Sequence, residues 1–225
     1  MHIVNQQQRI ERIAQTGYEF NPSDAISEGW TLFRKNPGPF VIYAFIVVAI
    51  SLGGSMIPIV GSIAVGVIGP VLTAGWYLGA RKLDITNQVE TGDFFKSFDF
   101  FVQLLLGGIV GGLLTLLGTI LLILPGIWIA VGIVFVYQLI VFAGIDFWEA
   151  IKLSIKVITK QWWSFFGFVI LIFLINLLGV IALGVGLLIS IPVSYLAIYC
   201  AYKKVIGFEE GSEMKISDHL VDDRI

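Results

Sequence analysis

Six apolar stretches, each close to the ~20 residues that a helix needs to cross a bilayer, constrain this chain more than any other feature. They occupy residues 40–57, 59–80, 100–124, 126–145, 163–183 and 184–202. Only 13% of the 225 residues are charged, whereas soluble domains carry roughly 25%. The chain is therefore predicted to be an all-α, polytopic membrane protein with about six transmembrane helices.

The six stretches come in three pairs, and their connections predict three helical hairpins. Within each pair the connection is short, uncharged and broken by Gly or Pro, as at Pro58, Pro125 and Gly184. All 14 Lys and Arg lie outside these hairpin tips. Because Lys and Arg in short loops stay in the cytoplasm, we expect the tips on the far side and both termini in the cytoplasm. The protein is thus predicted to be a multi-pass protein of the cytoplasmic (inner) membrane.

Each hairpin is preceded by a short segment that resembles an amphipathic helix. Asn21 and Pro22 form a typical helix start, Asp146 begins a second such segment, and residues 91–98 form a shorter version. In residues 147–160 a stripe of Ile lies beside a stripe of Lys. We expect these helices to lie in the interface, with their apolar faces toward acyl chains and their lysines toward headgroups.

The first and third hairpin units resemble each other in sequence. Asp24-Ala25-Ile26 aligns with Glu149-Ala150-Ile151, and Pro70 and Pro192 fall at matching places after a small gap. The two copies are separated by an even number of spans, so they form a parallel internal repeat. Convergent membrane composition is the alternative explanation.

Three regions follow from this pattern: a polar N-terminal segment (1–20), a transmembrane domain (21–206) and an acidic cytoplasmic tail (207–225). Cys200 is the only cysteine, and His2 and His219 lie in the terminal segments. No P-loop, nucleophile elbow or metal-ligand spacing is present. We therefore expect no catalytic residue, no metal and no cofactor. The net charge of −2 does not suggest a nucleic-acid partner.

Polar and small residues inside the spans leave two interpretations open. Gln103, Gln138 and Asn176 are intramembrane amides, which either hydrogen-bond a neighbouring helix or line a polar cavity, as Tyr137 also could. The Gly-x-x-x-Gly spacings of residues 107–112 fit close packing inside the bundle or a homo-oligomer face.

Basic residues gather at the predicted cytoplasmic interface. They are Arg34, Lys35, Arg81, Lys82, Lys152, Lys156, Lys160, Lys203 and Lys204. Such a ring would attract anionic phospholipid headgroups by ~1 kcal/mol per residue. The alternative is that these residues only set the topology.

Several motifs together carry a resemblance to known membrane proteins. They are residues 29–37 (GWTLFRKNP), 92–95 (GDFF), 124–128 (LPGIW), 147–154 (FWEAIKLS) and 184–192 (GVGLLISIP). The pattern resembles a widespread group of uncharacterised prokaryotic six-helix membrane proteins, and is similar to the membrane domain attached to some glycerophosphoryl diester phosphodiesterases. The resemblance implies a fold but no activity, because the phosphodiesterase chemistry belongs to a separate soluble domain.

The function that these features favour is non-catalytic binding of membrane lipid or of a membrane-protein partner. A transporter or flippase for a lipid or an amphipathic solute is the first alternative, and it would need a polar cavity. A membrane-embedded enzyme is the second alternative, and the missing nucleophile and metal ligands argue against it.

Overall fold

All of the regular structure in the described part of the chain is helical. A computed structural model describes residues 2–57, 59–182 and 184–208, and it shows no strand within these ranges. Five segments are long and apolar enough to cross a membrane: Pro37–Ser55, Val60–Thr86, Thr91–Leu121, Ile123–Ala143 and Trp162–Ile181. The predictions of an all-α fold and of a multi-pass membrane protein are confirmed at this level. The predicted acidic tail lies almost entirely outside the described residues.

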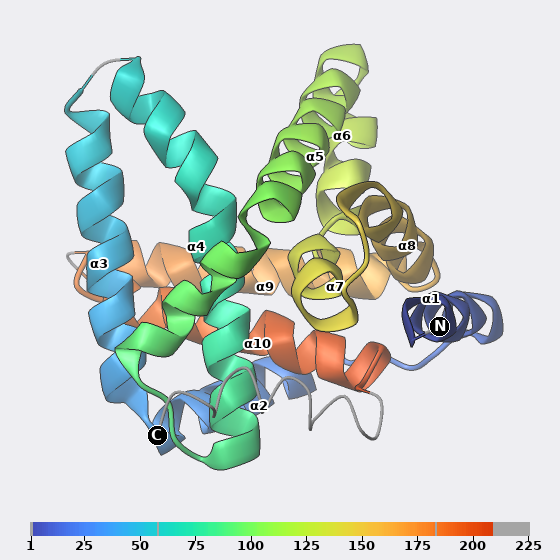
Figure 1. Cartoon of the computed structure of the whole chain (residues 1–225), viewed down its shortest axis with the longest axis horizontal. Helices are drawn as coiled ribbons and strands as arrows, with labels where there is room; N and C mark the ends of the chain where they lie inside the picture. The colour runs from blue at the N-terminus through green and yellow to red at the C-terminus, as the bar shows by residue number, and fades with distance from the viewer. Residues whose placement is uncertain (1, 58, 183, 209–225) are drawn as a thin grey trace.

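The helices after the N-terminal one follow a common plan, in which a short helix precedes a helical hairpin (Figure 1). The N-terminal helix is α1 (His2–Thr16). The first unit contains α2 (Pro22–Lys35), α3 (Pro37–Ser55) and α4 (Val60–Thr86). The second contains η1 (Thr91–Phe100), α5 (Phe101–Leu121), α6 (Ile123–Gly132) and α7 (Val136–Ala143). The third contains α8 (Phe147–Thr159), α9 (Trp162–Ile181) and α10 (Leu187–Val205).

Local sequence signals explain where the short helices begin. The Asn21 side chain accepts a hydrogen bond from the backbone N–H of Ser23 at 3.1 Å, and Pro22 occupies the first turn of α2. Asp146 accepts from the backbone N–H groups of Trp148 and Glu149 in the first turn of α8. At η1, Glu90 and Asp93 form a reciprocal capping box. Each of these caps satisfies N–H groups that lack a partner within the helix, so the predicted starts are confirmed.

Each hairpin is closed near its tip by two glycines on opposite helices. The pairs are Gly54 with Gly61, Gly118 with Gly126, and Gly179 with Gly186. A Cβ atom on Gly186 would lie 2.8 Å from the Cα atom of Gly179, and one on Gly61 would collide with the carbonyl oxygen of Gly54. Glycine is therefore required at these places, since only backbones without side chains approach so closely.

The three units pack on one another in a ring. The short helix of each unit lies against the second hairpin helix of the preceding unit, with α2 on α10, η1 on α4, and α8 on α6 and α7. Gly29 of α2 lies so close to α10 that an added Cβ would be 2.5 Å from the backbone nitrogen of Ala197. At Gly79 of α4, an added Cβ would collide with the ring of Phe94 from η1. This ring is an arrangement that the sequence did not predict.

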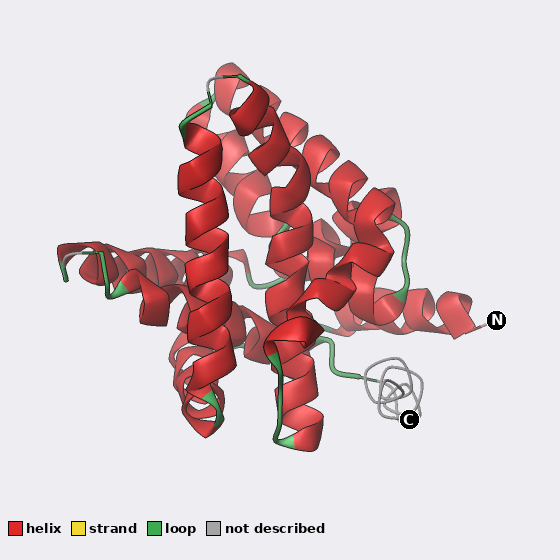
Figure 2. Ribbon diagram, turned by 60° about the vertical axis from the view of Figure 1, so that its left-hand side comes forward, coloured by secondary structure: helices red, strands yellow, loops and turns green. Residues whose placement is uncertain are grey.

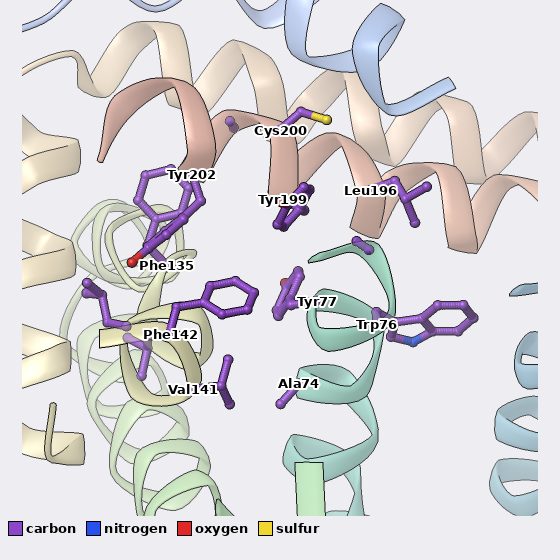
Figure 3. Packing of buried hydrophobic residues seen from close by; sticks show 14 of the residues in the cluster. Ala74, Trp76, Tyr77, Phe135, Val141, Phe142, Leu196, Tyr199, Cys200 and Tyr202 are labelled. Atoms are coloured by element: carbon purple, nitrogen blue, oxygen red, sulfur yellow. The ribbon is translucent and has the colours of Figure 1, made fainter. Parts of the chain in front are cut away.

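Because the units follow one another around a ring, their hairpins point in different directions. Figure 1 shows α9 and α10 running across the direction of α3 and α4, and Figure 2 shows one hairpin projecting sideways from the others. The second hairpin helices α4, α7 and α10 meet at the centre. There Tyr77, Phe142 and Tyr199 point toward one another, with 6.0 Å between the ring centroids of Phe142 and Tyr199 (Figure 3).

The second hairpin departs from the continuous span predicted for residues 126–145. Its return arm breaks between α6 and α7, at residues 133–135. The buried hydroxyl of Ser154 from α8 donates a hydrogen bond to the carbonyl of Gly132 at 2.6 Å and accepts one from the N–H of Phe135 at 3.1 Å. A break in an apolar environment is tolerated when a side chain satisfies the freed backbone groups, and Ser154 does so here.

Two expectations about the short helices need correction. The apolar face of α8 is buried in the protein rather than turned toward acyl chains, since Ile151 and Ile158 contact neighbouring helices and are almost inaccessible. The N-terminal segment is also more than a polar segment. It forms α1, in which Ile10 and Ala14, one helical turn apart, are buried, and α1 packs on α8.

Candidate functional site

Most of the predicted basic residues contact a polar or acidic side chain. The pairs are Lys35 with Asn87, Lys82 with Asp93, Lys152 with Glu149, Lys156 with Glu11, Lys203 with Asp84, and Lys204 with Asp24 and Glu28. Arg34 and Lys160 differ from them: both side chains are exposed, and neither has an ion-pair partner among the described residues. The predicted ring therefore contains few cations that remain available to a ligand.

Arg81 and Lys82 do not belong to a surface ring at all. Lys82 is buried and its ammonium lies 2.6 Å from a carboxylate oxygen of Asp93. Arg81 is 2% exposed, and its guanidinium carbon lies 3.5 Å from the centre of the Phe208 ring. The packing of η1 covers Lys82, and Phe208 lies over Arg81, which also lines an open pocket with Asp84 and Lys203. These two cations are therefore much less exposed than the predicted ring assumed.

Lys160 lies in a wide, open hollow between the second and third units. The hollow has a volume of about 840 Å³ and is lined by Leu124, Pro125, Trp128, Thr159, Lys160, Gln161, Trp162, Trp163 and Ser164. The lining residues come from the start of α6, the connection between α8 and α9, and the first turn of α9. An exposed cation thus lies among three tryptophans, without any carboxylate in the lining.

The tryptophans differ in how they lie. Trp163 is 78% exposed, and Trp128 is 37% exposed. Trp162 stacks on Phe166, with 5.0 Å between ring centroids, and its indole N–H is buried without a hydrogen-bond acceptor among the described residues. Indole rings of this kind favour the headgroup level of a membrane, where one edge is apolar and the N–H meets a polar group.

The connection between α8 and α9 is held in place by the segment before α2. The side-chain amide of Gln161 donates a hydrogen bond to the carbonyl of Tyr18. The Tyr18 hydroxyl donates one to the carbonyl of Val157 at 3.0 Å. Burial raises the pKa of Tyr18, so this hydroxyl keeps its proton and its donor role at physiological pH. Lys160 is therefore presented from a connection that is anchored on the protein.

The hollow brings together two segments that the predicted topology places on opposite sides of the membrane. Leu124 and Pro125 belong to a hairpin tip expected on the far side, whereas Lys160 and Gln161 belong to a connection expected on the cytoplasmic side. All four line the same hollow, although the hydrocarbon core is ~30 Å thick. The tip of the second hairpin and this connection therefore lie on the same side, or at the same depth.

The three intramembrane amides each contact another helix. Gln103 accepts from the N–H of Phe147 at 3.0 Å, at the start of α8. Gln138 donates to the carbonyl of Ile198 at 3.1 Å, while its amide oxygen is buried with no partner among the described residues. The sequence could not distinguish neighbour contacts from a cavity. The structure shows contacts for all three, and a cavity beside Asn176.

Asn176 of α9 forms a polar cluster with two serines of α10. Its amide nitrogen donates to the Ser194 hydroxyl at 2.7 Å, and its oxygen accepts from the Ser190 hydroxyl at 3.0 Å. The amide nitrogen also donates to the carbonyl of Ile172 at 2.9 Å, and the two serines reach Asn176 together because they lie one turn apart on the facing helix. The sequence signal for this partner was the spacing of Ser190 and Ser194, which went unnoticed.

The tryptophans of the hollow were also missed from the sequence, although the adjacent pair Trp162 and Trp163, separated from Lys160 by one residue, is typical of a membrane interface. The glycines at 107, 108 and 111 pack inside the protein, against side chains of neighbouring helices.

Compared with protein-family models, curated proteins and solved structures, the chain matches none of them.

Proposed function

We propose that this chain is a non-catalytic protein of the cytoplasmic membrane that binds an anionic phospholipid in the hollow beside Lys160. The observation that carries the proposal is the exposed, unpaired Lys160 ammonium in a hollow lined by Trp128, Trp162 and Trp163. A phosphate is attracted by the ammonium, and the indoles suit the headgroup and glycerol level. The apolar side chain of Leu124 would contact the acyl chains.

We further propose that the first hairpin crosses the membrane with both termini in the cytoplasm. Support comes from the Lys and Arg residues, all of which lie outside the hairpin tips. A full crossing by the third hairpin as well, as six spans require, needs α9 and α10 to turn from the direction in which they run across α3 and α4 (Figure 1). The second hairpin enters the apolar region, and its tip stays beside the connection between α8 and α9.

The parallel repeat of the first and third units is also a proposal, and two structural matches support it. Pro70 and Pro192 both lie inside the second hairpin helix. The tip glycines have the same spacing of seven in both units, at 54 and 61 and at 179 and 186. The likeness to the membrane domain of some glycerophosphoryl diester phosphodiesterases remains a proposal about the fold alone.

The lipid proposal is tested by the variant Lys160→Gln. Native mass spectrometry of the purified full chain with phosphatidylglycerol should show clearly less bound lipid than the unaltered protein, because the only unpaired cation of the hollow is removed. Lys156→Gln is the matched control, since Lys156 lies one turn away, is paired with Glu11 and does not line the hollow. Equal lipid retention by the two variants would contradict the proposal.

A further inference from the structure

Two partly open cavities lie away from the hollow, on either side of Thr73 and Ile198. One has a volume of about 470 Å³ and lies between the first and third hairpins. The other has a volume of about 320 Å³ and lies between α4, α5, α10 and the break between α6 and α7. Thr73 and Ile198 line both cavities, so little more than these side chains separates them. Neither cavity shares a lining residue with the hollow.

The lining of both cavities is apolar with a few hydroxyl and amide groups. The larger one is lined by Asn176, Ser194 and Tyr195 among aliphatic side chains. The smaller one is lined by Tyr77 and Tyr137, and neither hydroxyl has a hydrogen-bond partner among the described residues. A polar group in an apolar environment costs free energy unless it is bonded. The two tyrosine hydroxyls therefore favour a bound group that accepts or donates a hydrogen bond.

Charge restricts what that bound group can be. No Asp, Glu, Lys, Arg or His among the described residues lines either cavity. A charged ligand would lose its hydration there without gaining an ion pair, which is strongly unfavourable. The ligand should therefore be uncharged, with an apolar body and a polar group that reaches Tyr77 and Tyr137.

We propose that these two cavities bind an uncharged lipid whose carbonyl or hydroxyl group hydrogen-bonds Tyr77 and Tyr137. Its apolar chain lies past Thr73, in the larger cavity. This site is separate from the anionic headgroup site at Lys160 and does not depend on it. Diacylglycerol has the required chemistry, because it combines ester carbonyls, one hydroxyl and no charge.

Three glycines provide positions for a test: substitution of two of them would place a side chain in a cavity, and substitution of the third would not. Gly69 lines the larger cavity and Gly112 lines the smaller one, and a Cβ atom added at either would meet nothing within 4 Å. We expect leucine at these places to extend into the open space. Gly66, also on α4, is equally open but lines neither cavity. Gly66→Leu is therefore the matched control for Gly69→Leu and Gly112→Leu.

The test uses a diacylglycerol with a photoreactive acyl chain and a phosphatidic acid with the same chain, each added to the full chain in phosphatidylcholine vesicles. Cross-linked peptides are then identified by mass spectrometry. We expect diacylglycerol to label α4, α5 and α10 at the cavities, and the double variant Gly69→Leu/Gly112→Leu to lose this labelling while Gly66→Leu keeps it. Tyr77→Phe/Tyr137→Phe should weaken it by about fivefold, the factor that ~1 kcal/mol represents.

Three results would overturn this inference: equal labelling in the double leucine variant and in Gly66→Leu, no effect of the phenylalanine substitutions, or equal labelling of the cavities by phosphatidic acid. The headgroup proposal is judged separately in the same experiment. Phosphatidic acid should label the residues around Lys160, and that labelling should depend on Lys160 and not on Gly69 or Gly112.

Discussion

At the scale of single residues, the contacts of buried polar groups were the hardest feature to predict from the sequence. Lys82 was expected at a surface, because a Lys next to Arg81 at the end of an apolar stretch is typical of an interface. Its partner Asp93 lies on η1, after an intervening turn. Sequence could not identify this contact, since it depends on how η1 folds back over α4. Lys160, by contrast, was also expected at the surface, and it is exposed there.

The Lys82–Asp93 pair leads to a prediction about stability. Lys82→Met leaves the buried carboxylate of Asp93 without its cation, and breaking a buried pair in this way costs ~3–5 kcal/mol. Thermal unfolding in detergent should show a large decrease in melting temperature. Lys35→Met, at an exposed residue, should change it little. The double variant Lys82→Met/Asp93→Leu should recover part of the loss, and an equal effect of the two single changes would contradict the buried pair.

At the scale of elements, helix starts and hairpin turns were predictable because their signals are local. Asn21 and Asp146 each act within a few residues. The second hairpin turns at Leu122, slightly before the predicted tip at Pro125, which lies in the first turn of α6. The break between α6 and α7 was not predictable, because no Pro or charged residue marks residues 133–135. It is stabilised by Ser154, which is far along the chain and reaches the break only through the packing of α8 on α6 and α7.

The role of Ser154 can be tested directly. Ser154→Ala removes the acceptor for the N–H of Phe135 and the donor for the carbonyl of Gly132, and leaving such buried groups unsatisfied costs ~1–3 kcal/mol. We expect lower thermal stability and faster hydrogen exchange at the Phe135 amide. Ser27→Ala, at an exposed position of α2, is the control. Unchanged exchange at Phe135 would mean that the break does not depend on this hydroxyl.

At the scale of the whole molecule, the three units pack in a ring. The number of hairpins, which the sequence predicts, does not determine how these hairpins are oriented relative to one another. The sequence predicts which segments are helical, but the ring depends on which faces meet, as at Gly29 and Ala197. Those two residues are far apart in the chain, and neither looks unusual by itself. The same packing brings the tip of the second hairpin to the connection between α8 and α9, which creates the hollow around Lys160.

The position of that tip gives the last prediction, which concerns topology. In a Cys200→Ala background, cysteines at Pro125 and Gln161 should be joined by a short bifunctional maleimide, because both positions line one hollow. A pair at Gly61 and Gln161 should not be joined, since the tip of the first hairpin lies far from that connection (Figure 1). Labelling of intact cells separates the possible topologies. Cysteine at Gly61 should react from outside, and cysteine at Asn87 should not. Reaction at Gly184 from outside would show that the third hairpin also crosses the bilayer.

Cysteines at Pro125 and Gln161 should behave alike in the same labelling experiment, whichever side they face, because a charged reagent reaches both from one compartment. If Pro125 reacts from outside while Gln161 reacts only after permeabilisation, and the pair is not cross-linked, the second hairpin crosses the bilayer completely. Leu124 would then lie across the hydrocarbon core from Lys160, and a single headgroup could not contact both sides of the hollow. The proposed lipid site therefore requires that Pro125 and Gln161 face the same compartment, whatever the total number of spans.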